Sequence, residues 1–262
     1  SCESHTGSGD INVSRDESVE ISVESSEEIE IKDVSGYEQY LKVSKIDNVL
    51  AERGFVDVGA NKDYTPLNYD VIKACWISQF DFDSVYYTSK KQRNESSFKS
   101  LVIQAYDNLL SLGFNTVIVQ VRPNTDSFYP SAYYPWSSYV LYKYGRFASY
   151  DPLKIMVDEA HKREISFHAW INPMRGMSSS NLGLVADEYV MSDWVGTRKF
   201  YEYSSLNYLN IAYEDVRELI INGAAEIVRN YDVDGVHMDD YFYPTTSESF
   251  DSISYQSYVK NG

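Results

Sequence analysis

The stretch VDGVHMDDYFYP, residues 233–244, sets the fold that the rest of the chain is expected to adopt. It begins as an apolar strand, continues into two carboxylates, Asp239 and Asp240, and ends in three aromatic residues and a proline. Barrel enzymes of the α/β class carry their reactive side chains at the C-terminal ends of the strands. The pattern therefore indicates the functional rim of such a barrel. The alternative is an acidic turn, because Asp is common in turns.

Three further apolar segments precede this stretch and alternate with helical patterns. The expected strands cover residues 71–78, 115–123 and 165–173. Continuous apolar strands that alternate with helices predict an α/β fold in which helices cover a parallel sheet. Long loops follow the strands and short turns follow the helices. That asymmetry favours a (β/α)8 TIM-type barrel over a doubly wound open sheet, which usually carries a glycine-rich first turn.

Helical spacing and capping residues mark three helices between these strands. In residues 97–112 an apolar face recurs at spacings of three and four before Gly113, and it comprises Phe98, Leu101, Val102, Ala105, Leu109 and Leu112. Asp151 is placed to cap the next helix, with Pro152 in its first turn. A third helix is expected over residues 213–230.

Strand alternation then sorts the side chains into two faces. One face is polar toward the strand ends and comprises Ile118, Gln120, Arg122, His168, Trp170, Asn172, Gly235, His237 and Asp239. The other face stays apolar and should meet the helices. The prediction places Arg122, Asn172 and Asp239 in one layer inside the barrel, and it selects Asp239 over Asp240 as the inward carboxylate.

A carboxylate in that position can attack the anomeric carbon of a sugar or stabilise the positive charge that develops there. Arg122 would keep this acid ionised, and its alternative role is a structural salt bridge. His168 and His237 could hydrogen-bond sugar hydroxyls, or each could be a core histidine. Asp126 is a further rim candidate, or an acid of a loop turn.

The same residue types also allow a metal site. His168, His237, Asp239 and Asp240 are chemically suitable ligands, but no His-x-His or close ligand spacing accompanies them. We therefore predict neither a metal nor a cofactor. Cys75 lies in an apolar strand and is expected to be a buried thiol without a nucleophilic role.

Aromatic residues are abundant, with 24 Tyr and 4 Trp. Aromatic faces stack on sugar rings, although most aromatic residues in any protein belong to the core. The candidate platforms for a glycan are Tyr133, Tyr134, Trp136, Trp170, Tyr241 and Tyr243.

Charge is unevenly placed along the chain. The formal net charge is −16, and residues 1–35 carry ten acids against two basic residues. That composition predicts a disordered acidic tether at 1–35, a lead-in at 36–70 and the barrel segment at 71–262. The sequence has no basic patch, so nucleic acid is not an expected partner.

The first residues suggest attachment to a membrane. Ser1-Cys2 followed by a polar run is typical of a processed bacterial lipoprotein, in which Cys2 carries lipid; the alternative is an incidental cysteine. No run of 18 apolar residues occurs, so a lipid at Cys2 is the only membrane contact expected. The expected location is the bacterial cell envelope or its exterior.

Four motifs in order resemble the bacterial glycosyl-hydrolase-like family ten. They are KACWIS, GFNTVIVQVRPNTDSFYPSAYYPWSSY, YDPLKIMVDEAHKREISFHAWINPMR and LNIAYEDVRELIINGAAEIVRNYDVDGVHMDDYFYP. The resemblance implies a glycosidase with a (β/α)8 barrel, related to the α-amylase-like barrels, that acts on a bacterial polysaccharide, with peptidoglycan glycan strands the first candidate. Those barrels carry the nucleophile within Gly-x-Arg-x-Asp, and Gly235 to Asp239 fits this spacing with His237 in place of Arg.

The resemblance also has departures. The family's Leu-Asn-Pro is Leu209-Asn210-Ile211 here. Only about the first four βα units are recognised, whereas a barrel needs eight. The general acid is therefore expected on a C-terminal half-barrel that this sequence lacks. The alternatives are a glycan-binding envelope lipoprotein without catalysis, a metal hydrolase, and a purely structural envelope protein.

Overall fold

The computed structural model describes residues 63–261. The predicted acidic tether at 1–35, most of the lead-in and the lipidation candidate Cys2 lie outside the described residues. Within residues 63–261, no helix is long and apolar enough to cross a membrane.

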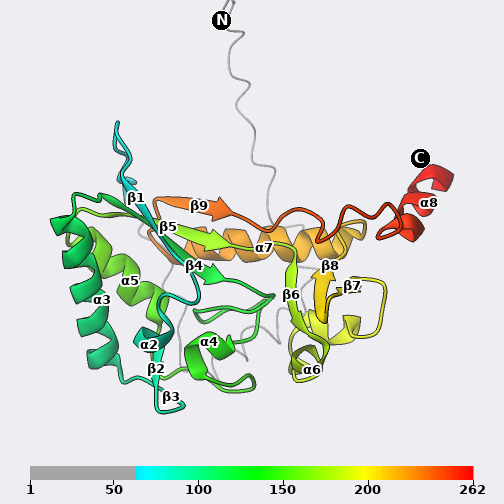
Figure 1. The fold of residues 1–262 in the computed structure, drawn as a ribbon, viewed down its shortest axis with the longest axis horizontal. Helices are drawn as coiled ribbons and strands as arrows, with labels where there is room; N and C mark the ends of the chain where they lie inside the picture. Colours follow the sequence, from blue (N-terminus) through cyan, green and yellow to red (C-terminus); the bar gives the residue numbers. More distant parts are fainter. Residues whose placement is uncertain (1–62, 262) are drawn as a thin grey trace, which may run out of the picture. The chain divides into compact units, whose positions relative to one another are not determined.

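The described part of the chain is organised around a four-stranded parallel sheet (Figure 1). Its strands are β1 (Ala74–Ile77), β4 (Thr116–Arg122), β5 (Ser166–Ile171) and β9 (Gly235–Met238), and they lie side by side in chain order. These are the four predicted strands, each somewhat shorter than the sequence pattern suggests. The prediction of an α/β fold with a parallel sheet is confirmed. Closure into eight strands stays a prediction.

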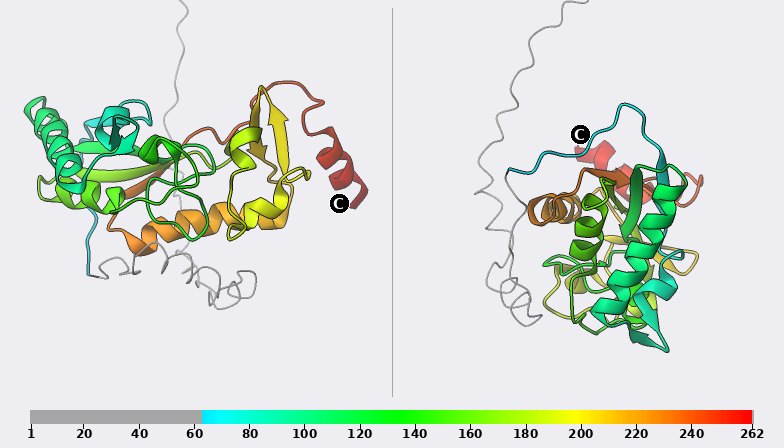
Figure 2. Two further views of the ribbon diagram at one scale, coloured as in Figure 1. Left: turned by 90° about the horizontal axis from the view of Figure 1, so that it is seen from below. Right: turned by 90° about the vertical axis from the view of Figure 1, so that its left-hand side faces the viewer.

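Three helices supply the apolar cover of this sheet. They are α3 (Glu95–Ser111), α5 (Pro152–His161) and α7 (Glu214–Asn230), and they pack on the face formed by Val117, Val119, Phe167, Ala169 and Ile171. Figure 2 shows these helices side by side along the sheet. The apolar face of the strand alternation therefore meets the helices, as predicted, except at Met238 at the end of β9, which is 45% exposed.

The caps explain where these helices begin. The Asn94 side chain accepts a hydrogen bond from the Ser97 amide at 2.9 Å, so α3 begins two residues before the predicted start. Asp151 caps α5 through the Lys154 amide at 3.1 Å, as predicted. Leu112 is predicted on the buried face, but α3 ends at Ser111 and Leu112 is 74% exposed.

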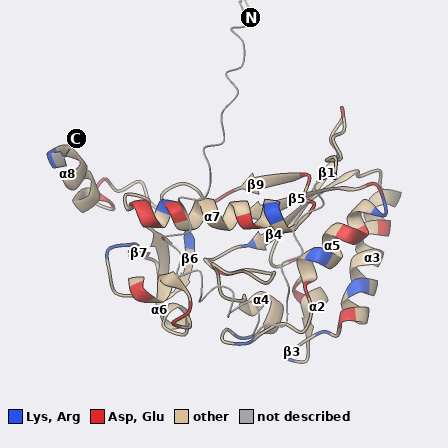
Figure 3. Cartoon of the chain, turned by 180° about the vertical axis from the view of Figure 1, so that it is seen from behind, with Lys and Arg blue, Asp and Glu red and all other residues tan. Residues whose placement is uncertain are grey.

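Charges along the outer helices are mixed in sign (Figure 3). Helix α7 begins with Glu214 and Asp215 and carries Arg229 in its last turn. This order suits the helix dipole, which favours acids at the N-terminus and bases at the C-terminus.

The region after β5, predicted as a long loop, forms a second small sheet. It contains β6 (Arg175–Ser178), β8 (Leu206–Leu209) and β7 (Phe200–Tyr203), in that order and antiparallel. Gly176 is needed where β6 meets β8, because a Cβ there would lie 2.2 Å from the Asn207 carbonyl oxygen. The remaining elements are α2 (Asp83–Tyr86), β2 (Tyr87–Thr88), β3 (Lys91–Gln92), α4 (Ser138–Leu141), α6 (Ser179–Leu182), the 3-10 turn Val190–Trp194 and α8 (Ser252–Asn261).

Candidate functional site

The face of the sheet opposite the helices carries two ordered layers of side chains. Trp76, Ile118, His168 and Gly235 are paired across the four strands, and Gln120, Trp170 and His237 form the next layer. This is the arrangement that strand alternation predicts. Trp76 is 54% exposed, so the face is open in the described part of the chain.

The two histidines belong to these layers. A Cβ at position 235 would lie 2.8 Å from the His168 ring, so only glycine leaves room for this imidazole. Burial lowers the pKa of His168, and a neutral ring is favoured there. The His237 ring meets the Trp76 and Trp170 rings edge to face, each with centroids 6.0 Å apart.

Arg122 does not join the layer that the sequence predicts. The β4–β5 register shifts between Gln120 and Arg122, so that Arg122 stands opposite Ile171 on the helix side of the sheet. An extra residue in one strand reverses the alternation after it. The Arg122 guanidinium lies 4.4 Å from the Tyr134 ring and is buried. The prediction that the Arg122 side chain shares one layer inside the barrel with Asn172 and Asp239 is wrong, although the Asn172 amide donates to the Arg122 carbonyl at 2.8 Å.

The rest of the aromatic loop after β4 also turns inward. Asp126 is buried and accepts hydrogen bonds from the Asn124 amide and the Tyr144 hydroxyl, both at 2.9 Å. Burial raises the pKa of Asp126 despite these bonds. Tyr134 and Trp136 are buried as well, and Tyr133 is partly buried. Their placement is that of core residues, and Asp126 organises its own loop.

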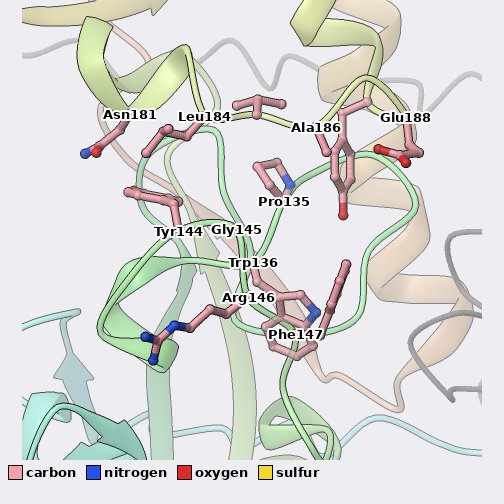
Figure 4. Close-up of a pocket in the computed structure, with 12 residues that line it drawn as sticks. Pro135, Trp136, Tyr144, Gly145, Arg146, Phe147, Asn181, Leu184, Ala186 and Glu188 are labelled. Carbon is pink, nitrogen blue, oxygen red and sulfur yellow. The ribbon is translucent and has the colours of Figure 1, made fainter.

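Trp136 also lines a pocket between this loop and the segment after α6. The cavity measures about 250 Å³, and its walls include Tyr144, Phe147, Leu184 and Tyr189 (Figure 4). The lining is mostly apolar, and Arg146 and Glu188 are the charged residues among the side chains that surround it. The pocket lies on loops that follow strands β4 and β6.

The structure does bring together a polar cluster at the ends of β5, β6 and β9. The Trp170 Nε1–H donates to Asn172 Oδ1 at 2.9 Å, and Asn172 Nδ2 donates to Asp240 Oδ2 at 3.1 Å. Arg175 Nη1 reaches the same Asp240 oxygen at 3.0 Å. Asp239 is adjacent, and its Oδ1 accepts the Asp240 amide at 2.8 Å. Of the residues selected from sequence, Trp170, Asn172, Asp239 and Asp240 therefore meet at one place.

Sequence reasoning missed Arg175 and its neighbour Tyr208. Arg175 pairs with Tyr208 in the β6–β8 ladder. Burial raises the pKa of Tyr208, while the charge of Arg175 lowers it and that of Asp240 raises it. The signal for Arg175 is a charged residue two positions after the end of the third predicted strand. Tyr208 carries no comparable signal, because the sequence pattern predicts a loop where the small antiparallel sheet lies.

The aromatic residues after β9 lie beyond this cluster and are open. Tyr241 is 63% exposed, and Tyr243 is exposed too but donates its hydroxyl proton to Asp251 at 2.7 Å. That hydrogen bond raises the pKa of Tyr243 to about 12. Both rings are available for contact with another molecule.

Two further features bear on the chemistry. Residues 63–261 hold no group of three or more His, Cys, Asp or Glu side chains placed to bind a metal ion. Cys75, expected to be buried, is only partly so, because β1 is an edge strand. Burial, followed by the charge of Asp81, raises the pKa of this thiol, which disfavours the reactive thiolate.

Comparisons with solved structures find distant matches that include glycosidases. A maltogenic α-amylase from Thermotoga neapolitana matches 73% of this chain and 44% of its own, at 14% identity and a TM-score of 0.40. An α-L-fucosidase from Paenibacillus thiaminolyticus matches 71% of this chain and 26% of its own, at 17% identity and a TM-score of 0.45.

Sequence relatives are closer. Glycosyl hydrolase YngK of Bacillus subtilis is 38% identical over 198 residues, which cover 72% of this chain and 37% of the relative. Glycosyl hydrolase DigH of Escherichia coli K12 is 36% identical over 171 residues, or 60% of this chain and 38% of the relative. The matched part of this chain thus spans less than two fifths of either relative. A family model described as "Glycosyl hydrolase-like 10" matches residues 71–262, and the chain belongs to this family.

Proposed function

We propose that this chain carries the nucleophile side of a glycoside hydrolase site that acts on a bacterial polysaccharide, with peptidoglycan glycan strands as the first substrate to test. One observation carries the proposal. Asp239 and Asp240 stand at the C-terminal end of β9, within a cluster that includes Asn172, directly after the neighbouring strand β5, and Arg175, at the start of β6. Carboxylates at that end of a parallel α/β sheet are where barrel enzymes carry out their chemistry.

Asp239 is the carboxylate proposed to react. Its amide donates to the Ile171 carbonyl at 3.1 Å, which extends the β5–β9 ladder by one residue and directs its side chain to the face of His237. In a retaining reaction a carboxylate oxygen bonds to the anomeric carbon while the glycosidic C–O bond breaks. A carboxylic acid gives its proton to the leaving oxygen, and water then hydrolyses the ester. Alternatively, Asp239 stabilises the cationic transition state.

The proposal requires an acid from elsewhere. Because the matched region spans under two fifths of the relatives, we propose that further strands of a complete barrel supply this acid and close the open face around Trp76 and His237. Reading the gene beyond the codon for Gly262 tests this. A continuation with apolar strands and a carboxylate at a strand end is expected, and an immediate stop codon would contradict it.

Attachment to the cell envelope is a separate proposal. Its basis is the cysteine at position 2 and the polar, Ser- and Glu-rich run that follows it. Metabolic labelling of cells with a radioactive fatty acid should mark the protein, and Cys2→Ser should abolish the label. Labelling that persists in the variant would rule out Cys2 as the anchor.

The activity test uses the purified complete protein and three substrates: peptidoglycan glycan strands, chitin oligosaccharides and starch oligosaccharides. New reducing ends should appear with the first substrate, and Asp239→Asn should reduce their rate at least about 1,000-fold, as removal of a covalent catalyst does. Asp215→Asn is the matched control. It removes an acid of α7 that pairs with Lys199, and the variant should hydrolyse the glycan strands as fast as the wild type. Equal rates in Asp239→Asn and the control would overturn the role of Asp239.

The exposed rings favour a second candidate function, glycan binding without hydrolysis. Trp76, Tyr241 and Tyr243 present open aromatic faces of the kind that stack on sugars. Binding of the same glycan strands, measured by calorimetry, together with no new reducing ends from the complete protein would support this function over catalysis.

A further inference from the structure

The two adjacent carboxylates after β9 differ in their surroundings. Asp240 has a φ of +50°, a left-handed conformation that costs energy in residues other than glycine and is best tolerated by Asn and Asp. Its Oδ2 accepts from both Asn172 at the end of β5 and Arg175 at the start of β6. Asn172 is itself held, because its Nδ2 also donates to the Pro123 carbonyl at 3.2 Å, at the end of β4. Asp240 thus ties the turn after β9 to the ends of three other segments.

Among residues 63–261, the hydrogen bonds that hold Asp239 come from this turn and from the strand beside β9. Its amide continues the ladder to Ile171, and its Oδ1 accepts the amide of Asp240. The direction of the Asp239 carboxylate therefore depends on the backbone conformation at position 240. A change of φ at Asp240 would move the amide that fixes Oδ1.

We infer that Asp240 is a positioning residue, and that Asn172 and Arg175 hold it so that the turn aims the Asp239 carboxylate at the substrate. The inference rests on the proposed function of Asp239. It assigns different roles to two acids that the sequence presents as equivalent, and it adds Arg175 to the site.

The surroundings of Asp240 argue against its acting as the proton donor. Its Oδ2 already accepts from Asn172 at 3.1 Å and from Arg175 at 3.0 Å, so this oxygen is engaged in holding the turn. The two acids also share one turn, so they cannot stand on opposite sides of a scissile bond as a catalytic pair must.

The first test measures hydrogen exchange of the backbone amides in residues 238–243 and does not depend on activity. Arg175→Gln and Asp240→Gly should each raise the exchange rate there about tenfold, because they release the turn. Asp240→Gly keeps a residue that tolerates positive φ, so it removes the carboxylate without adding strain. Asp215→Asn, which breaks an ion pair of α7, should leave this segment unchanged. Unchanged exchange in both Arg175→Gln and Asp240→Gly would overturn the inference.

The second test separates positioning from chemistry in the complete protein. Sodium azide should restore cleavage of the glycosidic bond to Asp239→Gly, because the azide enters the space left by the carboxylate while the acid of the complete protein still protonates the leaving oxygen. There an azide nitrogen bonds to the anomeric carbon as the glycosidic bond breaks, and glycosyl azide is the product. Asp240→Gly should lose turnover and gain nothing from azide, whereas Asp240→Asn, whose amide oxygen can still accept from Arg175, should recover most of it. Azide rescue of Asp240→Gly would make Asp240 the reacting group and overturn the inference.

The two tests fail in distinguishable ways. If the wild-type protein hydrolyses none of the three glycans, the proposed function fails, and the exchange rates still decide whether Asn172 and Arg175 hold the turn. If hydrolysis is found but Asp240→Gly leaves the exchange rates unchanged and azide rescues Asp240→Gly as well as Asp239→Gly, the proposed function stands and the division of roles is wrong.

Discussion

The ends of β4 and β9 carry similar sequences but opposite structures. Each is an apolar strand that runs into charged and aromatic residues. At β4 the charged groups Arg122 and Asp126 are buried, and the loop folds back so that the Phe128 amide donates to the Val121 carbonyl at 2.9 Å. At β9 the acids Asp239 and Asp240 keep access to solvent and stand beside open aromatic rings.

The difference comes from the strand register and from the segment after each strand. A bulge turns Arg122 to the helix side, where α7 and Tyr134 enclose it, while β9 pairs with β5 without a shift. A charged residue at a strand end is therefore a functional candidate only if no bulge interrupts the alternation of side chains along the strand before it. We expect the β4 charges to affect stability and the β9 charges to affect activity, and substitutions at each strand end can test that division.

The largest expected effect on stability is that of Arg122→Ala. The change leaves a cavity beside Tyr134, and it removes the positive charge from a buried cluster in which Arg122 and the Glu226 carboxylate both act on the Tyr129 hydroxyl. The free energy of unfolding should fall by about 3 kcal/mol. Arg122→Met keeps most of the volume without the charge, and it should recover more than half of that loss. Urea unfolding measures both, and a loss below about 1 kcal/mol for Arg122→Ala would deny the structural role.

Gly223→Ala tests how tightly α7 packs against the buried Arg122 side chain. A Cβ at this position would lie 2.3 Å from Arg122 Nη1 and 2.3 Å from a ring carbon of Tyr134. Both side chains are buried and have little room to move, so we expect a loss of about 2 kcal/mol. Gly183→Ala is the matched control, because its Cβ would meet only ordinary contacts at 3.6 Å or more. Equal stability of the two variants would show that α7 does not enclose Arg122 tightly.

The sequence is sufficient to predict the four strands, three helices and the apolar face, because each rests on a local period. It also places Trp170, Asn172, Asp239 and Asp240 correctly at one end of the sheet. It fails at Arg122, because a bulge leaves no mark in the pattern of TVIVQVR. It fails at Tyr208 for a different reason: the pairing of β6 with β8 is a contact between segments about 30 residues apart, which no local period encodes.

Asp126→Asn tests how the buried acid in the loop after β4 makes stability depend on pH. Burial raises the pKa of Asp126 above its ordinary value of 3.8. The folded protein therefore holds this proton more firmly than the unfolded chain does. The corresponding stability is fully present below pH 3.8 and is lost as the pH rises through the folded-state pKa. As the pH rises through the folded-state pKa, the free energy of unfolding of the wild type should fall relative to that of Asp126→Asn. A difference between the two proteins that stays constant from about pH 4 to about pH 7 would contradict the prediction.

Arg175→Gln should have the smallest effect on stability and a large effect on turnover. The side chains of Arg175 and Asp240 are 33% and 30% exposed, so water and salt screen their attraction, and the loss should be under about 1 kcal/mol. Added sodium chloride should narrow the difference from wild type still further, since it screens a pair that water reaches. Urea unfolding at low and high salt measures this, beside hydrolysis of glycan strands by the same preparation. A loss of unfolding free energy as large as that of Arg122→Ala would mean that the charges at both strand ends stabilise the fold. The proposed difference between the ends of β4 and β9 would then be wrong.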